Sequence, residues 1–435
     1  MEATSSISWK AEAKRTLQFL RAELRPRGKI WTPFNLISGA IILTGAIILA
    51  FRFFYGLGAV TNLNQDYPWG IWKGFNVVTG VAFAGGAYVL VFLVYVLHQE
   101  QYRPIVRVTI LNGFLAYVFY AGALLLELGR PWNVINPVIG NSFGFSSVLF
   151  LVAWHFMLYM IAQFVEFSPA IAEWLGWKRI HRVLHAMTLG AVVFGISLSI
   201  LHQSGLGALF LMAKDKIHPL WYSEFIPIQF LVSSVFAGLA MVIFEGTLSK
   251  SVFKTRVSPS YHFSHERIVL SLSRICAGAM FVYLFLQTLI FVHGQDWKHL
   301  SGFWGAWYGV EIVGFVAVPC VLFTLAYRRR NTSLARWAAV GAMLGIVLNR
   351  LNVSLIAYKI GAPVRYVPTW MELVVALSVI LAEVWVFRWI VNRLPVLGEA
   401  PAWTHAAEEA SKEVIPHARP AAVQSNECSV ASKEA

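Results

Sequence analysis

Ten long apolar runs limit what this sequence can fold into. They cover about residues 33–55, 70–97, 106–127, 146–166, 184–206, 226–248, 268–292, 303–327, 334–358 and 370–392. Each exceeds the ~20 residues that a helix needs to cross a ~30 Å hydrocarbon core. Because a helix satisfies its own backbone hydrogen bonds inside lipid, the sequence predicts an all-α integral membrane protein with ten transmembrane helices.

The composition agrees with a surface that faces lipid. Charged residues make up 13% of the 435 residues and hydrophobic residues 57%, whereas soluble domains carry about 25% charged residues. The net charge of +13 does not indicate a nucleic-acid partner, because the basic residues lie between apolar runs rather than on one soluble face. The lipid bilayer is therefore the first expected partner.

Lys and Arg are distributed unevenly between the two sides of these runs. Seven precede the first run and thirteen lie in loops on the same side, against six in the loops on the opposite side: Arg130, Lys214, Lys216, Lys298, Lys359 and Arg365. Loops rich in Lys and Arg stay in the cytoplasm, so both termini are expected there. An odd number of helices would destroy this alternation, which supports the count of ten.

The two ends of the chain differ from the apolar middle. Residues 1–30 form a basic N-terminal segment, in which an amphipathic helix over 9–25 is expected to lie on the inner membrane surface. No cleavable signal peptide is apparent in this segment. Residues 31–394 are predicted to form the membrane domain, and residues 395–435 a disordered cytoplasmic tail rich in Ala, Glu and Lys.

The three cysteines do not form a motif for metal binding. Cys276 and Cys320 fall inside apolar runs, Cys428 lies in the tail, and no two are close in sequence. A Cys-ligated zinc site, an iron–sulfur cluster and a c-type haem motif are therefore not expected in this chain. No metal site is predicted.

Polar side chains from several helices converge at the predicted outer ends. Such groups are costly in lipid and often mark a pathway or a binding site. The set around the second, third and fifth helices comprises Asp66, Trp69, Trp72, Lys73, Asn76, Glu127, Arg130, His202, Gln203 and Ser204. The alternatives are structural: Glu127 could pair with Arg130 within one turn, and Glu311 could bridge to Arg350 between the eighth and ninth helices.

Three further groups lie deeper in the predicted membrane. His155 is near mid-depth, and Glu166 and Glu245 lie toward the inner face. Together they could line a proton path from the cytoplasm to the outer polar residues. Separate interhelical hydrogen bonds are the competing interpretation.

Several motifs occur in a characteristic order along the chain. They are Asp-Tyr-Pro-Trp-Gly-Ile-Trp at 66–72, the glycines at 80, 85 and 86, His-Gln-Ser-Gly-Leu-Gly at 202–207, His-Pro-Leu-Trp at 218–221, Ile-Phe-Glu-Gly at 243–246 and Tyr-Val-Pro-Thr-Trp-Met-Glu at 366–372. Together they resemble the NrfD/polysulfide-reductase family of membrane subunits. Within it the sequence is most similar to the HybB-like subunit of periplasmic, menaquinone-linked nickel–iron hydrogenases, over roughly residues 30–395.

The resemblance implies an architecture and a set of partners. It implies two four-helix bundles, formed by helices two to five and six to nine and flanked by helices one and ten. It also implies a bacterial cytoplasmic (inner) membrane location, a site for menaquinone or another quinone near the outer face of the first bundle, and no haem. The implied partners are a periplasmic iron–sulfur subunit of the four-cluster type and a catalytic subunit, such as the large and small hydrogenase subunits.

The candidate roles follow from quinone chemistry, in which reduction takes two electrons and two protons. His202 can donate to a quinone carbonyl and supply a proton near neutral pH, and Asp66 could orient His202 or relay that proton. Trp69 and Trp72 could pack against the ring. The expected function is a quinone-reactive membrane anchor subunit of a respiratory oxidoreductase, with proton translocation as an added hypothesis.

Other functions stay open at this point. A b-type cytochrome needs two histidines at one depth on facing helices, and the candidate pairs are His202 with His293 and His98 with His185. A subunit of another complex of the same type, such as polysulfide reductase, is equally compatible with the motifs. A secondary transporter would place its site near mid-membrane. The sequence does not indicate the catalytic partner, the direction of electron flow or the quinone type.

Overall fold

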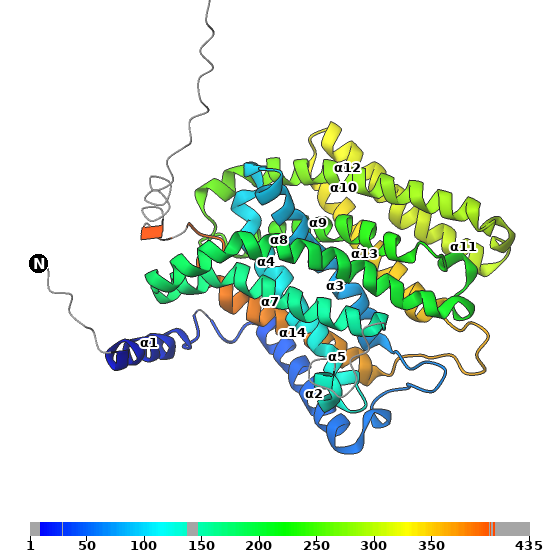
Figure 1. Cartoon of the computed structure of the whole chain (residues 1–435), viewed down its shortest axis with the longest axis horizontal. Helices are drawn as coiled ribbons and strands as arrows, with labels where there is room; N and C mark the ends of the chain where they lie inside the picture. Colours follow the sequence, from blue (N-terminus) through cyan, green and yellow to red (C-terminus); the bar gives the residue numbers. More distant parts are fainter. Residues whose placement is uncertain (1–8, 28, 137–146, 400, 402, 405–435) are drawn as a thin grey trace, which may run out of the picture. The chain divides into compact units, whose positions relative to one another are not determined.

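The computed structural model describes residues 9–27, 29–136, 147–399, 401 and 403–404, and this part of the chain is helical without a β-strand (Figure 1). It contains ten helical stretches that are long and apolar enough to cross a membrane: Pro33–Tyr55, Trp72–Val96, Glu100–Glu127, Val148–Leu175, Lys178–Lys216, Ile226–Val252, Pro259–His293, Phe303–Arg328, Thr332–Ile356 and Trp370–Val391. The predicted all-α membrane fold with ten spans is confirmed.

Five of these spans are continuous α-helices. They are α2 (Pro33–Tyr55), α7 (Val148–Leu175), α9 (Ile226–Val252), α10 (Pro259–His293) and α14 (Trp370–Val391). We use the term outer end for the end of each span on the side of Trp72, Glu127 and Trp370, following the orientation predicted from the sequence.

The other five spans change helix type along their length. The second consists of η2 (Trp72–Thr79), α3 (Gly80–Val91) and η3 (Phe92–Val96), and the third of η4 (Glu100–Tyr102), α4 (Arg103–Ala116), η5 (Tyr117–Ala121) and α5 (Gly122–Glu127). The fifth consists of α8 (Lys178–Ala208) and η7 (Leu209–Lys216), the eighth of α11 (Phe303–Gly309), η10 (Val310–Ala317) and α12 (Val318–Arg328), and the ninth of α13 (Thr332–Leu351) and η11 (Asn352–Ile356).

Wide, π-helical turns occur where polar residues enter the spans. The segments η2, η5, η10 and η11 carry Asn76, Tyr117, Glu311 and Asn352, respectively. π-helical turns are rare and frequent at functional sites. They therefore direct attention to the outer halves of the second, third, eighth and ninth spans.

The helices α3 and α9 cross at the centre with their backbones in contact. An added Cβ on Gly238 would lie 1.8 Å from the Gly86 backbone nitrogen, and one on Gly85 would lie 2.6 Å from the Ser234 carbonyl oxygen. Only glycine permits this approach, because any side chain would push the helices apart. This crossing joins the second span to the sixth.

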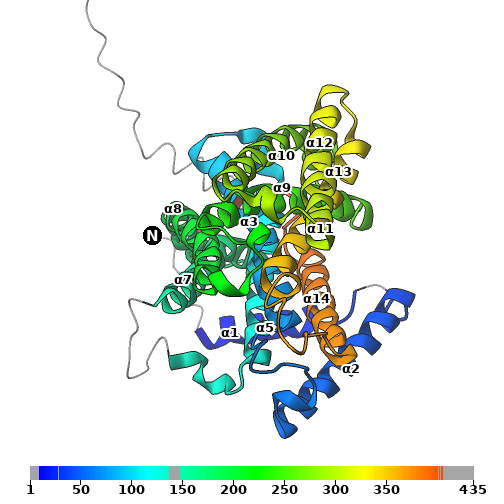
Figure 2. The same ribbon diagram turned by 90° about the vertical axis from the view of Figure 1, so that its right-hand side faces the viewer.

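The remaining spans pack in sequence around these two. One ring of contacts runs from α3 to α4, α7 and α8 and closes where α8 contacts α3. A second ring runs from α9 to α10, α12 and α13 and closes where α13 contacts α9. α2 packs against α14 (Figure 2). We refer to the second to fifth spans as the first half and to the sixth to ninth as the second half; their grouping into two bundles stays a prediction.

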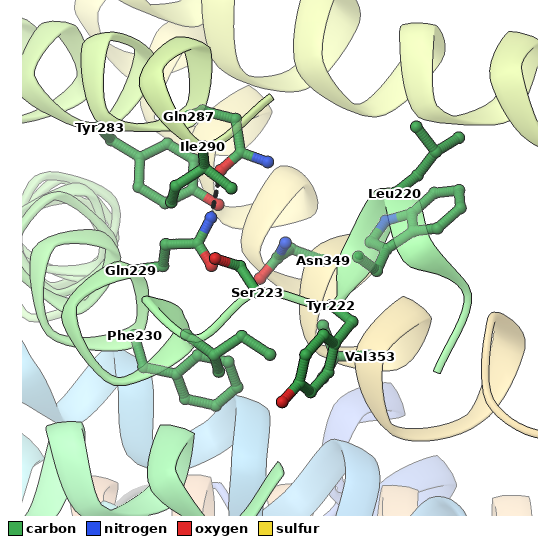
Figure 3. A pocket seen from close by; sticks show the side chains of 12 residues that line it. Leu220, Tyr222, Ser223, Gln229, Phe230, Tyr283, Gln287, Ile290, Asn349 and Val353 are labelled. Carbon is green, nitrogen blue, oxygen red and sulfur yellow. Dashed lines mark hydrogen bonds between the residues drawn. The ribbon is translucent and has the colours of Figure 1, made fainter. Parts of the chain in front are cut away.

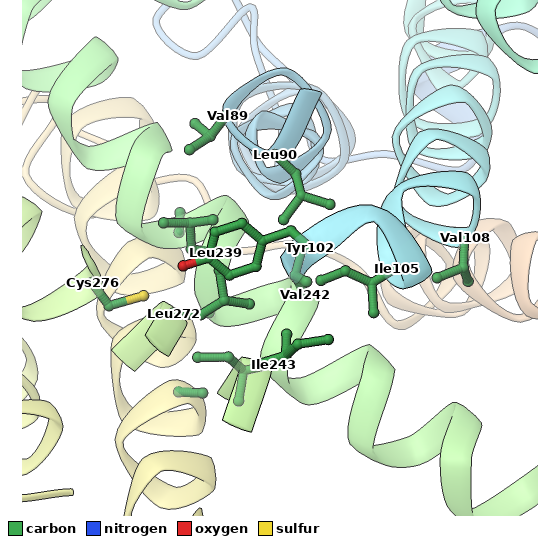
Figure 4. Close-up of a cluster of buried hydrophobic side chains, with 14 of the residues drawn as sticks. Val89, Leu90, Tyr102, Ile105, Val108, Leu239, Val242, Ile243, Leu272 and Cys276 are labelled. Atoms are coloured by element: carbon green, nitrogen blue, oxygen red, sulfur yellow. The ribbon is translucent and has the colours of Figure 1, made fainter. Parts of the chain in front are cut away.

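A fully apolar cluster holds the inner parts of both halves together. Leu90 and Tyr102 from the first half pack with Leu239, Leu272 and Cys276 from the second (Figure 4). The Tyr102 hydroxyl finds a partner in Ser271, at 2.6 Å. Cys276 and Cys320 are free, buried thiols, whereas Cys428 lies outside the described residues.

Residues near both ends of the described chain pack against the inner ends of the spans. α1 (Trp9–Glu23) occupies the predicted amphipathic segment, and its Phe19 ring lies 5.3 Å from Trp174. The compact unit extends to Gly398, beyond the predicted boundary at 394, because Val396 and Leu397 are buried. The disorder predicted for the tail concerns mainly residues 405–435, which lie outside the described part of the chain.

Candidate functional site

The outer end of the second span is held by two carboxylates. The Gly70 N–H donates to Glu127 Oε1 at 2.8 Å, and the Ile71 N–H donates to the Tyr366 hydroxyl at 3.0 Å. Tyr366 in turn donates to Glu372 Oε1 at 2.5 Å. The first N–H groups of a helix lack intrahelical partners and carry a partial positive charge. Negative groups therefore stabilise the Gly70–Ile71 turn.

Burial keeps Tyr366 in the form that donates. Tyr366 lies in the loop before the tenth span, and burial, together with its bond to Glu372, raises the pKa of its phenol well above the usual range. A tyrosine hydroxyl is protonated at neutral pH in any case, and the raised pKa keeps this one protonated in alkaline conditions as well. Tyr366 therefore bridges the two chain segments as a permanent donor and acceptor.

Lys73 brings a cation to the same position. Its Nζ lies 3.6 Å from Glu127 Oε1, and the side chains of Lys73 and Glu127 are 16% and 1% exposed, respectively. Nζ also lies 5.8 Å from the centre of the Trp69 ring, within range of a cation–π contact. Within the described chain, Glu127 Oε2 has no hydrogen-bond partner. We refer to Gly70, Lys73, Glu127, Tyr366 and Glu372 as the outer polar site.

Asn76 lies deeper along η2 and is completely buried. Neither its amide oxygen nor its amide nitrogen has a hydrogen-bond partner among the described residues. Buried polar atoms are rarely left unpaired, because each costs on the order of 1–3 kcal/mol. An amide in this state is available to a ligand or to water.

His202 is another buried group of the first half without a hydrogen-bond partner among the described residues. It is 2% exposed, and its ring lies 5.5 Å from that of Tyr117 and 5.9 Å from that of Phe156. Neither ring nitrogen makes a hydrogen bond of normal geometry within the described part of the chain, and the Val152 backbone is a near polar neighbour. A neutral imidazole beside aromatic rings can donate to or accept from one further polar group.

Other predicted site residues are already engaged in structural contacts. Gln203 donates to the Val81 carbonyl at 2.9 Å, and Ser204 donates to the Ile200 carbonyl of its own helix at 2.9 Å. Trp72 is buried and donates through Nε1 to the Glu372 backbone carbonyl at 2.8 Å. Arg130 is exposed, and Glu127 bonds to Gly70 rather than pairing with it.

Asp66 does not orient His202 in this structure. Its carboxylate accepts from Lys359 Nζ at 2.7 Å. That hydrogen bond raises the pKa of Lys359, so the ion pair persists to higher pH than an isolated lysine would allow. Asp66 and His202 share no contact within residues 9–27, 29–136 and 147–399. Equal depth does not fix which helices are neighbours, and the structure gives Asp66 a different partner; a proton relay through Asp66 stays a prediction.

The contribution of the tenth span was missed, although a signal for it exists. Thr369 and Glu372 form a capping box, in which the Thr369 hydroxyl accepts from the Glu372 N–H and Glu372 Oε2 accepts from the Thr369 N–H. Ser/Thr followed three residues later by Glu is a recognisable helix start. This signal places the Glu372 side chain in the first turn of the last span, from which it accepts a hydrogen bond from Tyr366.

Replacing Thr369 with Ala is expected to destabilise the protein by about 1 kcal/mol, because loss of an N-cap typically has this cost. The hydroxyl also donates to the Val60 carbonyl, which the variant would leave without this partner. Thermal unfolding of the detergent-solubilised protein measures the change. Thr324→Ala is the matched control, since its hydroxyl bonds only to Cys320 of its own helix. Equal midpoints for both variants would contradict this prediction.

The predicted proton-path residues fall into two separate groups. His155 and Glu166 both lie on α7, where Glu166 is close to Tyr159 and Gly195. Glu245 lies on α9, where Oε1 accepts from Ser249 at 2.7 Å and Oε2 has no partner among the described residues. The structure does not bring Glu245 next to Glu166.

The second half holds a buried charged network of its own. Glu311 accepts from Trp221 Nε1 at 2.6 Å, Asn349 at 2.7 Å and Asn352 at 2.5 Å. Arg350 donates to the Asn349 side-chain oxygen at 2.9 Å. The predicted bridge between Glu311 and Arg350 therefore exists, but the Asn349 amide mediates it.

Comparison with known proteins identifies the family. The chain matches the family described as "Polysulphide reductase, NrfD" over residues 59–360, which is more than half of its length. The chain belongs to the NrfD family. This membership supports a multi-pass membrane subunit with a role in electron transfer.

Two relatives extend the similarity of this NrfD-family chain over most of its length. A protein of Nitratidesulfovibrio vulgaris is 40% identical over 379 residues, which cover 87% of this chain and 97% of the relative. A protein of Escherichia coli named "Probable Ni/Fe-hydrogenase 2 b-type cytochrome subunit" is 30% identical over 386 residues, which cover 88% of this chain and 97% of the relative. The family match ends before Tyr366 and Glu372, so the contribution of the tenth span lies beyond it.

Proposed function

We propose that this chain is the quinone-reactive membrane subunit of a respiratory oxidoreductase. It passes electrons between a periplasmic iron–sulfur subunit and menaquinone in the bacterial cytoplasmic membrane, with both of its termini in the cytoplasm. A nickel–iron hydrogenase is the favoured catalytic partner, because the Escherichia coli relative carries the name of a hydrogenase 2 subunit. The direction of electron flow is not part of the proposal.

The observation that carries the proposal is the state of His202. A buried imidazole without a partner of normal geometry, flanked by the rings of Tyr117 and Phe156, has the features that a quinone requires. The ring of a quinone packs against aromatic faces, and its carbonyl accepts a hydrogen bond from a donor such as imidazole. His202 would hold one carbonyl oxygen through its N–H, and it would pass that proton to the oxygen as its other ring nitrogen takes up a proton from the proposed His155–Glu166 path or from water.

Asn76 and the outer polar site, on the second and third spans of the same half, support the same assignment. Asn76 offers a free amide, and Lys73 with Glu127 offers a partly exposed ion pair where an outer partner would dock. A quinone becomes a quinol by taking up two electrons and two protons. Lys73 would donate a proton to the second oxygen and take up a new one from the outer aqueous phase, to which it is 16% exposed, while the Glu127 carboxylate stabilises its cationic form.

Proton translocation is a subordinate proposal. His155 and Glu166 on α7 are the members of the predicted path that lie in the same half as His202. Glu245, with Ser249 and the neighbouring Tyr261, belongs to the second half. A path along α7 to the quinone therefore needs His155 and Glu166 but not Glu245.

The observed positions of the histidines favour quinone chemistry over a haem in this chain. His202 packs against the stacked rings of Tyr117 and Phe156, whereas His293 lies beside Phe225 at the end of α10. Bis-histidine ligation would require the two rings to face one another across a porphyrin. A polysulfide-reductase-type partner stays possible, because the family match does not distinguish the catalytic subunits that this chain serves.

The purified complex tests the proposal through its cofactors. We expect the tagged chain, isolated from its native membrane in mild detergent, to carry stoichiometric quinone and to co-purify with a subunit that gives iron–sulfur electron paramagnetic resonance signals. The reduced visible spectrum should lack a haem α-band that scales with this chain. A stoichiometric α-band, or a preparation with neither quinone nor an iron–sulfur partner, would refute the assignment.

A further inference from the structure

The Glu311–Arg350 network adjoins a small cavity of about 10 Å³ in the outer part of the second half, which has room for about one water. The amides of Gln229, Gln287 and Asn349 point toward one another around it (Figure 3). Gln229 donates to Gln287, and Gln287 donates to the Tyr308 hydroxyl at 3.0 Å. Such a lining supplies the several hydrogen-bond partners that a buried water needs. Asn349 is shared, because it lines the cavity and also bridges Glu311 to Arg350.

A wider cleft lies beside this cavity, and the two share part of their walls. The cleft has a volume of about 450 Å³ and shares Tyr222, Ser223 and Ile290 with the cavity wall. Its rim carries charged side chains of both signs, among them Lys214 and Glu224. A charged rim and an amide-lined interior are suited to water and small ions rather than to an apolar ring.

The cavity adjoins two buried charged side chains, Glu311 and Arg350. Arg350 and Glu311 are each 1% exposed, and Arg350 makes no ion pair within 4 Å of a carboxylate among the described residues. Arg350 donates instead to Ser233 at 2.7 Å, and its Nε has no partner in the described part of the chain. Two separated charges in a low-dielectric interior are costly, and water that entered from the cleft would lower this cost.

A route from the cleft through the cavity would end at this network. On α9, the residues between Ser233 and Glu245 include Phe236, Leu239 and Ile243, which are buried in the apolar core. At about 1.5 Å per residue, this stretch separates Ser233 from Glu245 by roughly 18 Å. The apolar segment therefore blocks continuous hydration toward the inner side.

We propose that the second half contains an outward-facing half-channel, in which the cleft and the cavity give water and protons access to the Glu311–Arg350 network. The half-channel exchanges protons between the outer aqueous phase and the Asn349-bridged pair. This function is independent of quinone binding, which is proposed for the first half.

Thiol accessibility tests the half-channel in native membranes that contain the whole complex. A small, membrane-impermeant thiol reagent is applied from the outer side to Ser223→Cys and Gln287→Cys variants, and each cysteine is followed by peptide mass spectrometry. Thiols react in water and are inert in apolar surroundings, so Gln287→Cys should react at least about tenfold faster than the native Cys276. Ser223→Cys, at the cleft, should react fastest.

The matched control is Phe285→Cys, at a position that is more exposed than Gln287 but is expected to react more slowly with the reagent. Phe285 lies on the same helix and is 59% exposed in the protein alone, but this side faces lipid, whereas Gln287 is 8% exposed and faces the cavity. Phe285→Cys should therefore react slowly and Gln287→Cys quickly. If the Gln287→Cys protein does not accumulate in the membrane, the Gln229→Cys variant tests the opposite wall of the cavity.

Two outcomes would overturn the proposal. One is a Gln287→Cys or Gln229→Cys variant that reacts no faster than Cys276 while Ser223→Cys reacts readily, which would show that the cleft does not open into the cavity. The other is reaction of these cysteines only from the cytoplasmic side.

Discussion

Replacing His202 with Ala should lower quinone-dependent turnover by roughly 10²- to 10⁴-fold, the range typical for loss of a positioned acid or base. His202 is a buried imidazole against the stacked rings of Tyr117 and Phe156, so its loss would remove both the proposed donor to a quinone carbonyl and the proposed proton source. Steady-state reduction of a soluble menaquinone analogue by the purified complex, with the donor of the catalytic partner, measures the effect. Electron transfer to an artificial acceptor at the partner should be unchanged.

The conservative variant separates chemistry from packing. His202→Gln retains a hydrogen-bond donor but cannot deliver a proton in the same way, so it should recover quinone binding more than turnover. His262→Ala, an exposed histidine on α10, is the matched control and should leave turnover unchanged. Full activity of His202→Ala with stoichiometric bound quinone would remove His202 from the site.

Replacing Arg350 with Met should destabilise the protein by about 3–5 kcal/mol, since removal of one partner leaves the other buried charge uncompensated. Glu311 would then keep only the neutral donors Trp221, Asn349 and Asn352. The loss should appear as a lower thermal midpoint and a lower yield of folded protein in detergent. Arg329→Met, at an exposed cation, should change stability by less than about 0.5 kcal/mol.

A double variant shows whether the cost comes from the unpaired charge. Arg350→Met combined with Glu311→Gln removes both charges and should recover much of the stability lost in the single variant, because neighbouring groups are energetically coupled. Additive losses in the double variant would mean that the two side chains stabilise the protein independently. Such additivity would contradict the amide-bridged pair described above.

The positions of the spans could be predicted from the sequence because hydropathy and helix length are local properties. The first and last spans start at Pro33 and Trp370, as predicted. α10 starts at Pro259 rather than near 268, since its first turns carry His262 and Glu266 and are too polar for an apolar run. The orientation of the spans and the lipid contacts of α1 stay predictions.

The partners of the site residues could not be predicted in the same way. The predicted depth in the membrane is the same for Asp66 and His202. In the structure, however, Asp66 accepts a hydrogen bond from Lys359, and His202 packs beside the rings of Tyr117 and Phe156. The π-helical turns could not be predicted from the sequence either. They change which face of a helix a residue occupies. Glu311 and Asn352 lie in such turns, so regular helical spacing could not show that both join one network.

The glycine crossing of α3 and α9 limits where a lipid-soluble molecule can enter or leave the protein. With Gly86 and Gly238 in backbone contact, the seam between the halves has no width for an isoprenoid tail. The quinone proposed to bind near His202 would then exchange with the bilayer between α7 and α8, which carry exposed apolar residues such as Ile161 and Phe194. An apolar groove of about 450 Å³ runs between these two helices, beside Ala162 and Ala191. Bulky substitutions in this groove would slow exchange without touching the residues that carry out the chemistry.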